Sequence, residues 1–171
     1  PLVKLVSSDG KEFAVDLKIA RMSTTIAQLM EAMKMEEENE SILENNSIPL
    51  EKVKEEQLQK VIEWCEYHKN DEKKEEKEEG KTKERSVHVV PEWDKQFLGI
   101  VEKLEDAALC DLFMAANYLD VRELFNNCSQ TFANILHGMK RDEIISRFNI
   151  HCDLSAEEIS EIKKKNAWCE E

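Results

Sequence analysis

Glycine, proline and long apolar runs are scarce in this chain of 171 residues. With only 4 glycines, the sequence contains no glycine-rich loop of the kind that cradles a phosphate group. No apolar run approaches the ~20 residues that a membrane-spanning helix needs. The N-terminus also lacks the pattern of a secretory signal, in which charged residues precede an apolar stretch. We therefore expect a soluble, intracellular protein without a phosphate-binding loop.

Basic residues are also in deficit. The sequence has 24 lysines and arginines against 37 aspartates and glutamates, which gives a formal net charge of -13 at pH 7. Such a field repels nucleic-acid phosphates and anionic membrane surfaces, so we expect neither nucleic acid nor membrane as a partner. A basic or mixed protein surface is a better candidate. With 41% hydrophobic residues, the chain can bury one core, or form a compact domain with a helical appendage.

The sequence provides no complete catalytic or metal-binding set. Its 5 cysteines are odd in number, and Cys65, Cys110 and Cys128 fall in predicted helices, which is typical of reduced thiols packed as small apolar side chains. His151 and Cys152 are sequence neighbours, which seldom face one another productively. The spacing Cys65-x-x-His68 is half of a zinc site without a second half. We expect no enzyme activity, no cofactor and no metal.

The first 70 residues combine strand and helix patterns. Residues 3–6 and 12–15 alternate apolar and polar side chains around Asp9-Gly10, which predicts a β-hairpin. Three further elements are predicted from caps, breakers and apolar spacing: a helix from Ser23 to Lys34, an edge strand at Ile48-Pro49-Leu50 and an amphipathic helix over residues 53–68. This part of the chain is predicted to be a small α+β unit.

A charged segment then interrupts the pattern. Asp71 to Arg85 contains seven acidic residues, six basic residues and no apolar side chain. Such a stretch buries too little surface to offset its ordering entropy, which predicts a mobile, solvated linker. The alternative is a single charged helix with Glu-to-Lys pairs such as Glu79 and Lys83, although Gly80 interrupts it.

Every element after the linker is predicted to be helical. The start signals of these helices are, in order, Pro91, the acidic pair at Glu105 and Asp106, a capping pair at Asp120 and Glu123, the segment before Ile144, Ile145 and Phe148, and a second capping pair at Ser155 and Glu158. Gly138 is predicted to end the third helix. Because strands precede the linker and helices follow it, we predict an α+β core extended by a helical tail.

The helix predicted over residues 121–138 carries apolar side chains on two neighbouring lines, roughly 80–100° apart at helical spacing. The two lines consist of Leu124, Cys128 and Ile135, and of Phe125, Phe132 and Leu136. One line can face the core of the chain, and the other then suggests a partner. The alternative is that both are buried between helices of the same chain.

Five motifs in register resemble one known family. They are Val3-Lys-Leu-Val-Ser-Ser-Asp-Gly, Val61-Ile-Glu-Trp-Cys, Ala115-Ala-Asn-Tyr-Leu-Asp, Phe148-Asn-Ile and Asn166-Ala-Trp-Cys-Glu-Glu. In this order they are similar to the adaptor subunit of SCF-type ubiquitin ligases, the S-phase-kinase-associated family, over essentially the whole chain. The resemblance implies a BTB/POZ fold, in which a small β-sheet packs against helices, extended by C-terminal helices.

The resemblance also implies a domain order and a function. Residues 1–70 would form the N-terminal part of the BTB/POZ fold, 71–86 a charged mobile linker, 87–138 the helical remainder of that fold and 139–171 F-box-binding helices. The implied function is that of a non-catalytic adaptor, which bridges the N-terminal domain of a cullin to F-box proteins that bind substrates. The implied location is the cytoplasm and the nucleus.

Residue by residue, the resemblance implies two binding surfaces. The positions that match the cullin-facing surface are Ile48, Pro49, Leu50, Asn117 and Tyr118. Those that match the F-box-facing surface are Phe125, Phe132, Leu136, Ile144, Phe148 and Trp168, and they include the second apolar line described above. For Tyr118, packing on its own domain is the structural alternative.

Two points stay open at the level of sequence. Glu51, Ser129 and Lys140-Arg141 depart from the family pattern, which predicts a paralogue with its own range of partners. A self-associating BTB scaffold, not tied to ubiquitin transfer, is the alternative function, and it predicts a symmetric homodimer through the N-terminal half. A homodimer of the unpartnered chain is compatible with either function.

Overall fold

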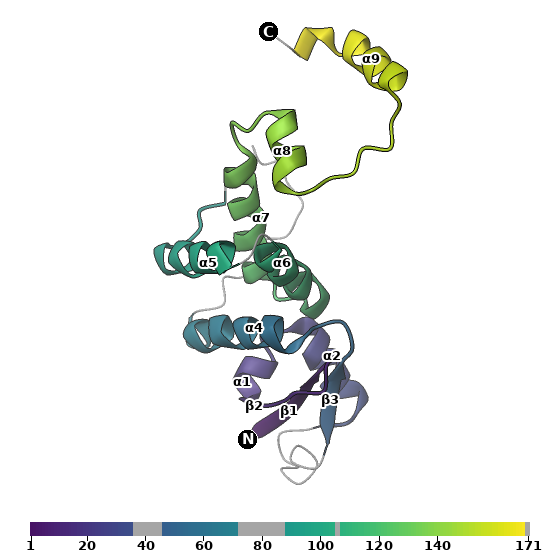
Figure 1. The fold of residues 1–171 in the computed structure, drawn as a ribbon. Coiled ribbons are helices and arrows are strands. Elements are labelled where there is room, and N and C mark those ends of the chain that lie inside the picture. The colour runs from purple at the N-terminus through teal and green to yellow at the C-terminus, as the bar shows by residue number, and fades with distance from the viewer. Residues whose placement is uncertain (36–45, 72–87, 105–106, 170–171) are drawn as a thin grey trace, which may run out of the picture. The chain divides into compact units, whose positions relative to one another are not determined.

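The computed structural model describes residues 1–35, 46–71, 88–104 and 107–169 (Figure 1). These residues form two compact units, residues 1–135 and residues 136–171. Of the predicted linker over residues 71–86, only Asp71 belongs to the described residues.

The first unit contains a three-stranded sheet in the order β2-β1-β3. Strands β1 (Leu2–Ser7) and β2 (Glu12–Asp16) pair antiparallel, and Gly10 in the turn between them has φ of 86°, which glycine adopts without strain. This confirms the predicted hairpin. Strand β3 (Ser47–Leu50) pairs parallel to β1 on the other side. The side chains of Val3, Leu5 and Val15 point into the core.

Helices cover this sheet and build the rest of the first unit (Figure 1). They are α1 (Leu17–Ala20), α2 (Thr24–Ala32), α4 (Glu55–His68), α5 (Glu92–Leu104), α6 (Ala108–Leu119) and α7 (Arg122–Leu136). Helix α6 packs against α2, α4 and α5, and α4 also packs against α1. The predicted helical period is confirmed in α4, where Leu58, Val61 and Cys65 are buried. The fold is therefore α+β, as predicted, with α6 at the centre of its helical layer.

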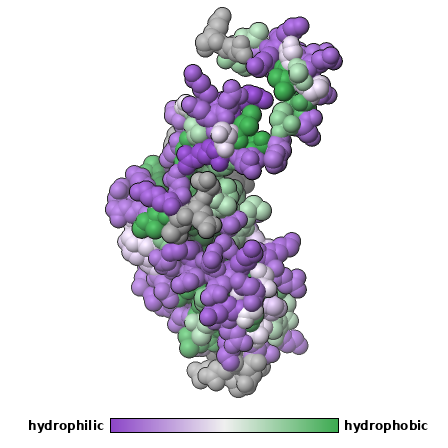
Figure 2. Space-filling model, in the orientation of Figure 1, coloured by the Kyte–Doolittle hydropathy of each residue, from purple (hydrophilic) through white to green (hydrophobic). Residues whose placement is uncertain are grey.

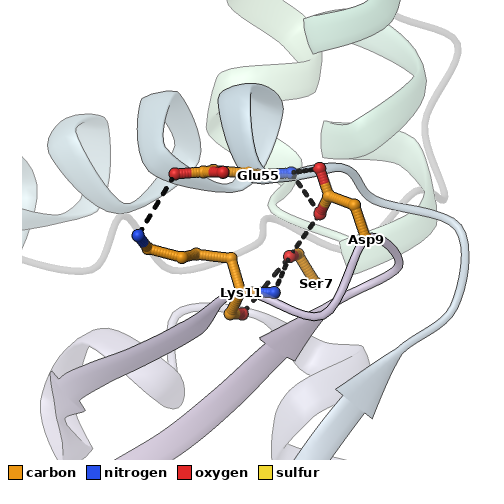
Figure 3. A network of polar contacts seen from close by, with 4 residues as sticks. All are labelled: Ser7, Asp9, Lys11 and Glu55. Carbon is orange, nitrogen blue, oxygen red and sulfur yellow. Dashed lines mark hydrogen bonds and ion pairs between the residues drawn. The ribbon is translucent and has the colours of Figure 1, made fainter.

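The β1–β2 turn is joined to the start of α4 by polar contacts (Figure 3). The carboxylate of Asp9 accepts hydrogen bonds from the backbone N–H of Glu55, at 3.0 and 3.2 Å, and from the hydroxyl of Ser7, at 2.5 Å. The Nζ of Lys11 lies 3.7 Å from a carboxylate oxygen of Glu55. Since the residue before α4, Lys54, makes no capping bond with its side chain, Asp9 supplies that bond from another element.

A buried polar cluster joins α4, α5 and α7. Asp94 has no exposed surface, and its Oδ1 accepts hydrogen bonds from Nε1 of Trp64, at 2.5 Å, and from Nδ2 of Asn127, at 2.8 Å. The Oδ1 of Asn127 lies 2.6 Å from Nε2 of His88. The Nε2 of His68 lies 3.2 Å from Oδ2 of Asp94, an ion-pair distance. Three helices thus share one set of buried polar partners.

The second unit consists of short helices. They are α8 (Arg141–Arg147), α9 (Ala156–Lys165) and the 3-10 turn η1 (Ala167–Cys169). At α9, Ser155 and Glu158 exchange the two hydrogen bonds of a capping box, which confirms that predicted start. No side chain of α8 or α9 is buried.

One predicted cap has a different place in the structure. Asp120 is the residue that ends α6, in the left-handed conformation with φ of 51° and ψ of 51°. Its backbone N–H donates to the carbonyl of Asn117, and that of Val121 donates to Ala116. Asp120 therefore forms the turn between α6 and α7, since Asp tolerates the left-handed conformation better than most residues. Within the described ranges, no helix combines the length and the apolar character needed to cross a membrane.

Candidate protein-binding surfaces

The C-terminal end of α6 carries two of the predicted cullin-facing residues. Asn117 is exposed and Tyr118 is half-buried. Met114, one turn earlier on the same helix, is 63% exposed. The Nζ of Lys52, between β3 and α4, lies 5.8 Å from the centre of the Tyr118 ring, which is within reach of a cation–π contact. We call Met114, Asn117, Tyr118 and Lys52 the α6 end surface.

The other three predicted cullin-facing residues, Ile48, Pro49 and Leu50, belong to β3. Ile48 and Leu50 are 0% and 1% exposed, because β3 alternates its side chains and these two face the core. Only Pro49, between them, points outward. Direct contact of a partner with the side chains of Ile48 and Leu50 would require β3 to leave the core. The predicted role of these two residues in cullin binding therefore stays a prediction, and their burial makes Pro49 the accessible side chain of the segment.

A second surface is formed by aromatic side chains of α6 and α7. The rings of Phe113 and Phe125 are stacked, with centroids 4.8 Å apart and planes 16° apart. The centroid of Phe132 lies 5.5 Å from that of Phe113. All three side chains are half-buried and pack on the edge of the core. Offset or tilted rings at such distances attract one another and stiffen the group. We call these three residues the aromatic cluster.

The two predicted lines of α7 differ in burial. Leu124 and Cys128 are 0% exposed, whereas Phe125 and Phe132 remain half-buried. Burial raises the pKa of the Cys128 thiol to about 12, so the thiol stays neutral and packs as an apolar group. The alternative in which both lines are fully enclosed is therefore not what the structure shows. Within the first unit, one line is buried at Leu124 and Cys128 and half-buried at Ile135, and the other is half-buried at Phe125 and Phe132.

Phe113 was predicted only as a helix residue and not as part of a site. Its position in α6 places it beside Phe125 and Phe132, which come from a different helix. Helical spacing within residues 108–119 groups Phe113 with the core residues Leu109 and Leu112. The signal that could have identified Phe113 is its angle from Leu112. Leu112 is 1% exposed, and Phe113 lies 100° further round the helix, at the edge of the buried face.

The remaining predicted F-box-facing residues belong to the second unit. Trp168 is 76% exposed and Leu136 is 36% exposed. Ile144 and Phe148 are half-buried, and the backbone N–H of Phe148 donates to the carbonyl of Ile144 at the end of α8. Hydrophobic side chains also lie at the surface of this unit among hydrophilic ones (Figure 2). Three of these are Ile150, Leu154 and Ile162, each 45–48% exposed.

The cysteine and histidine positions considered for metal binding or catalysis differ in exposure. Cys65 is 2% exposed, and burial raises the pKa of its thiol to about 12, which opposes the thiolate that a metal ligand or nucleophile needs. His151 and Cys152 are both exposed. Among the described residues, no three His, Cys, Asp or Glu side chains are grouped so that they could hold a metal ion.

The fold and these surfaces define a class of protein. It is an α+β protein with a small sheet and a helical extension, whose half-buried and exposed apolar side chains are available to other polypeptides. Comparison with protein families agrees with this class. Residues 1–70 match the Skp1 family tetramerisation domain, of POZ type, and residues 122–169 match the Skp1 family dimerisation domain.

Similar proteins match almost the whole chain. The "Suppressor of kinetochore protein 1" of Schizosaccharomyces pombe is 36% identical over 99% of this chain and 98% of its own length. The "Skp1-related protein" of Caenorhabditis elegans is 35% identical over 99% of this chain and 92% of its own length. The "E3 ubiquitin ligase complex SCF subunit sconC" of Arthroderma benhamiae is 32% identical over 99% of this chain and 95% of its own length. The chain belongs to the Skp1 family.

Proposed function

We propose that this protein is a non-catalytic adaptor subunit of an SCF-type E3 ubiquitin ligase, which bridges the N-terminal domain of a cullin to F-box substrate receptors. A relative named as an SCF subunit, 32% identical over 99% of this chain, supports the proposal. The observation that carries it is the aromatic cluster. Phe113, Phe125 and Phe132 pack on the core and yet stay partly open to solvent, as expected of anchors that a partner covers.

The geometry of α6 suits a bridging role. The helix contributes Phe113 to the aromatic cluster and Asn117 and Tyr118 to the α6 end surface. Phe113 and Tyr118 are five residues apart, which corresponds to about 7.5 Å along the helix axis and about 140° around it. One rigid, centrally packed helix can therefore present different faces to two partners. On this proposal the F-box protein covers the aromatic cluster, and the cullin contacts Asn117 and Tyr118.

The charge of the chain bears on its partners and its location. A net charge of -13 favours partners whose docking surfaces are basic or mixed, and it disfavours nucleic acid and anionic membranes. Leu136, Ile144, Phe148 and Trp168 of the second unit are proposed to extend the F-box contact. We place the protein in the cytoplasm and the nucleus, where buried free thiols such as those of Cys65 and Cys128 stay reduced.

A double lysine substitution at the α6 end surface tests the proposed cullin contact. Asn117→Lys combined with Tyr118→Lys replaces an amide and an aromatic ring by two flexible cations, which removes the anchor and its packing. We expect pull-down of a cullin N-terminal fragment to be lost. Binding of an F-box segment should be unchanged, because the aromatic cluster is intact.

A matched control adds the same charge elsewhere in the first unit. Gln59→Lys with Gln96→Lys changes exposed residues of α4 and α5, away from Asn117 and Tyr118 in sequence, and should leave cullin binding at the wild-type level. Loss of both cullin and F-box binding in the Asn117 and Tyr118 variant would indicate misfolding. Failure of the wild-type protein to bind any cullin fragment would reject the proposal itself.

A further inference from the structure

The N-terminus of α2 holds the C-terminal end of α6 through side-chain hydroxyls. The Oγ of Ser23 donates to the carbonyl of Leu119, and the Oγ1 of Thr25 donates to the carbonyl of Tyr118 at 2.8 Å. The backbone N–H and the Oγ1 of Thr24 both donate to the carbonyl of Asp120, each at 3.4 Å. The N-cap and the first two residues of α2 therefore bind three consecutive carbonyls, those of the last two residues of α6 and of its C-cap Asp120.

These hydrogen bonds satisfy carbonyl groups at the end of α6 that have no donor within the helix. The last four carbonyls of a helix have no partner within the helix. In α6, the carbonyls of Ala116 and Asn117 accept from the backbone N–H groups of Val121 and Asp120, at 3.0 and 3.2 Å. Those of Tyr118 and Leu119 are bound by the hydroxyls of α2. The orientation of the last turn of α6 thus depends on α2.

The hydroxyls of Ser23 and Thr25 differ in burial. A substitution at Ser23 would affect the stability of the core, whereas one at Thr25 mainly affects the position of α6. Ser23 is 2% exposed and also accepts a hydrogen bond from the backbone N–H of Ile26, at 3.1 Å, so its loss affects the core and the start of α2 together. Thr25 is half-buried, and its hydroxyl binds the carbonyl of Tyr118, whose side chain is itself half-buried. Thr25 is therefore the more informative residue of the pair.

The ring of Tyr118 is held from a third element. Lys52 lies between β3 and α4, and its Nζ is 5.8 Å from the ring centre. A cation over a ring face attracts it and limits the rotation of the side chain. The backbone of Tyr118 is thus fixed by α2 and its ring by the β3–α4 connection, whereas Asn117 beside it is exposed.

We infer that Thr25 and Lys52 are positioning residues for Tyr118 in the contact with the cullin. This inference rests on the proposed function and goes beyond it, since neither residue was predicted as part of a site. A large side chain held in its bound orientation loses less conformational entropy on association. Thr25 and Lys52 therefore strengthen cullin binding through Tyr118, and they have no effect on the aromatic cluster.

The test measures the affinity of each full-length variant for a cullin N-terminal fragment and for an F-box segment, by calorimetric titration. Thr25→Val keeps the shape and removes the hydroxyl, and it should weaken cullin binding about five-fold, the effect of one net hydrogen bond. Lys52→Met keeps the aliphatic stem and removes the charge, with an expected loss of about three-fold. F-box affinity should be unchanged in both, and Thr25→Ser should restore cullin binding.

Thr131 provides a matched control. Its Oγ1 donates to the carbonyl of Asn127 at 2.8 Å, so Thr131→Val deletes the same kind of bond within α7. Cullin affinity should not change in this variant. An equal loss of cullin binding in Thr131→Val and Thr25→Val would mean a general effect on stability, and would overturn the inference.

The remaining outcomes separate the inference from the proposed function. If the Asn117 and Tyr118 lysine variant loses cullin binding while Thr25→Val and Lys52→Met bind as the wild type, the adaptor function stands and the positioning role is rejected. If the wild-type protein binds no cullin fragment, both are rejected. If Thr25→Ser fails to restore binding lost in Thr25→Val, the hydroxyl is not the cause and the role of Thr25 is rejected.

Discussion

Asp9 is an exposed residue whose ionisation is coupled to folding. The hydrogen bond from Ser7 is the largest cause that holds the pKa of Asp9 below its ordinary value of 3.8, and the backbone N–H of Glu55 adds to it. Because the pKa in the folded state is lower than in the unfolded state, the ionised carboxylate stabilises the fold. This contribution is complete above about pH 5, and it is lost as the pH falls through the lowered pKa.

Asp9→Asn should therefore reduce stability in a pH-dependent way. At pH 7 we expect a lower urea midpoint than in the wild type, since the amide accepts more weakly from Glu55 and Ser7 than a carboxylate does. The difference between the two proteins should shrink as the pH falls through the lowered pKa, where the wild-type carboxylate becomes protonated. Urea unfolding followed by circular dichroism from pH 3 to pH 7 measures this. A difference that does not vary with pH would contradict the assignment.

At the scale of single residues, sequence identified which side chains are apolar and which faces they share. The helical period of α7 placed Phe125 and Phe132 on a line apart from Leu124, which the burial of these residues matches. It could not add Phe113, because proximity between helices is not encoded in the period of one helix. The resemblance covers the segment Ile48-Pro49-Leu50 as a whole and does not distinguish its two faces, whereas strand alternation places Ile48 and Leu50 opposite Pro49.

At the scale of elements, the buried cluster around Asp94 joins α4, α5 and α7. Asp94→Ala would leave the indole N–H of Trp64 and the amide of Asn127 without their acceptor in a site with no solvent access. We expect the free energy of unfolding to fall by about 3 kcal/mol, as for other buried polar groups that lose a partner. Chemical denaturation followed by circular dichroism measures the change.

The conservative variant at the same position is the control. Asp94→Asn keeps an oxygen near Trp64 and fills the same volume, so the expected loss is about 1 kcal/mol. If Asp94→Ala were as stable as the wild type, the cluster would not couple the three helices. Tyr67 of α4 and Trp93 of α5, stacked with ring centres 3.8 Å apart, are a further contact between these two helices that the substitution leaves in place.

Elements with strong local signals were predicted, and those set by tertiary contacts were not. The hairpin, the helical period of α4 and the capping box of α9 follow from turn residues, spacing and a Ser-to-Glu pair. Helix α1 is only 4 residues long, too short for a period, and depends on Asp16, whose carboxylate accepts from the N–H of Lys18. The parallel pairing of β3 with β1 joins segments that are far apart in sequence, and no local pattern specifies it.

At the scale of the whole molecule, the two units differ in how they use apolar residues. The first unit contains the buried hydrophobic core, whose members run from Val3 to Cys128. In the second unit, no residue of α8 or α9 is buried, and Trp168 is 76% exposed. A unit of this kind gains little stability from its own packing. Its apolar residues are better explained by a partner than by a core of its own.

Truncation before Ser155 tests this division of roles. The urea midpoint of the remaining chain should equal that of the full-length protein, because the core residues Val3 to Cys128 are all retained. Affinity for an F-box segment should fall by at least about 30-fold, since an exposed tryptophan anchor contributes about 2 kcal/mol or more to an interface. Trp168→Ala in the full chain should give most of this loss, and calorimetric titration measures both. Unchanged affinity in the truncated protein would remove the role assigned to Trp168, and a lowered midpoint would show that the first unit depends on the second for its stability.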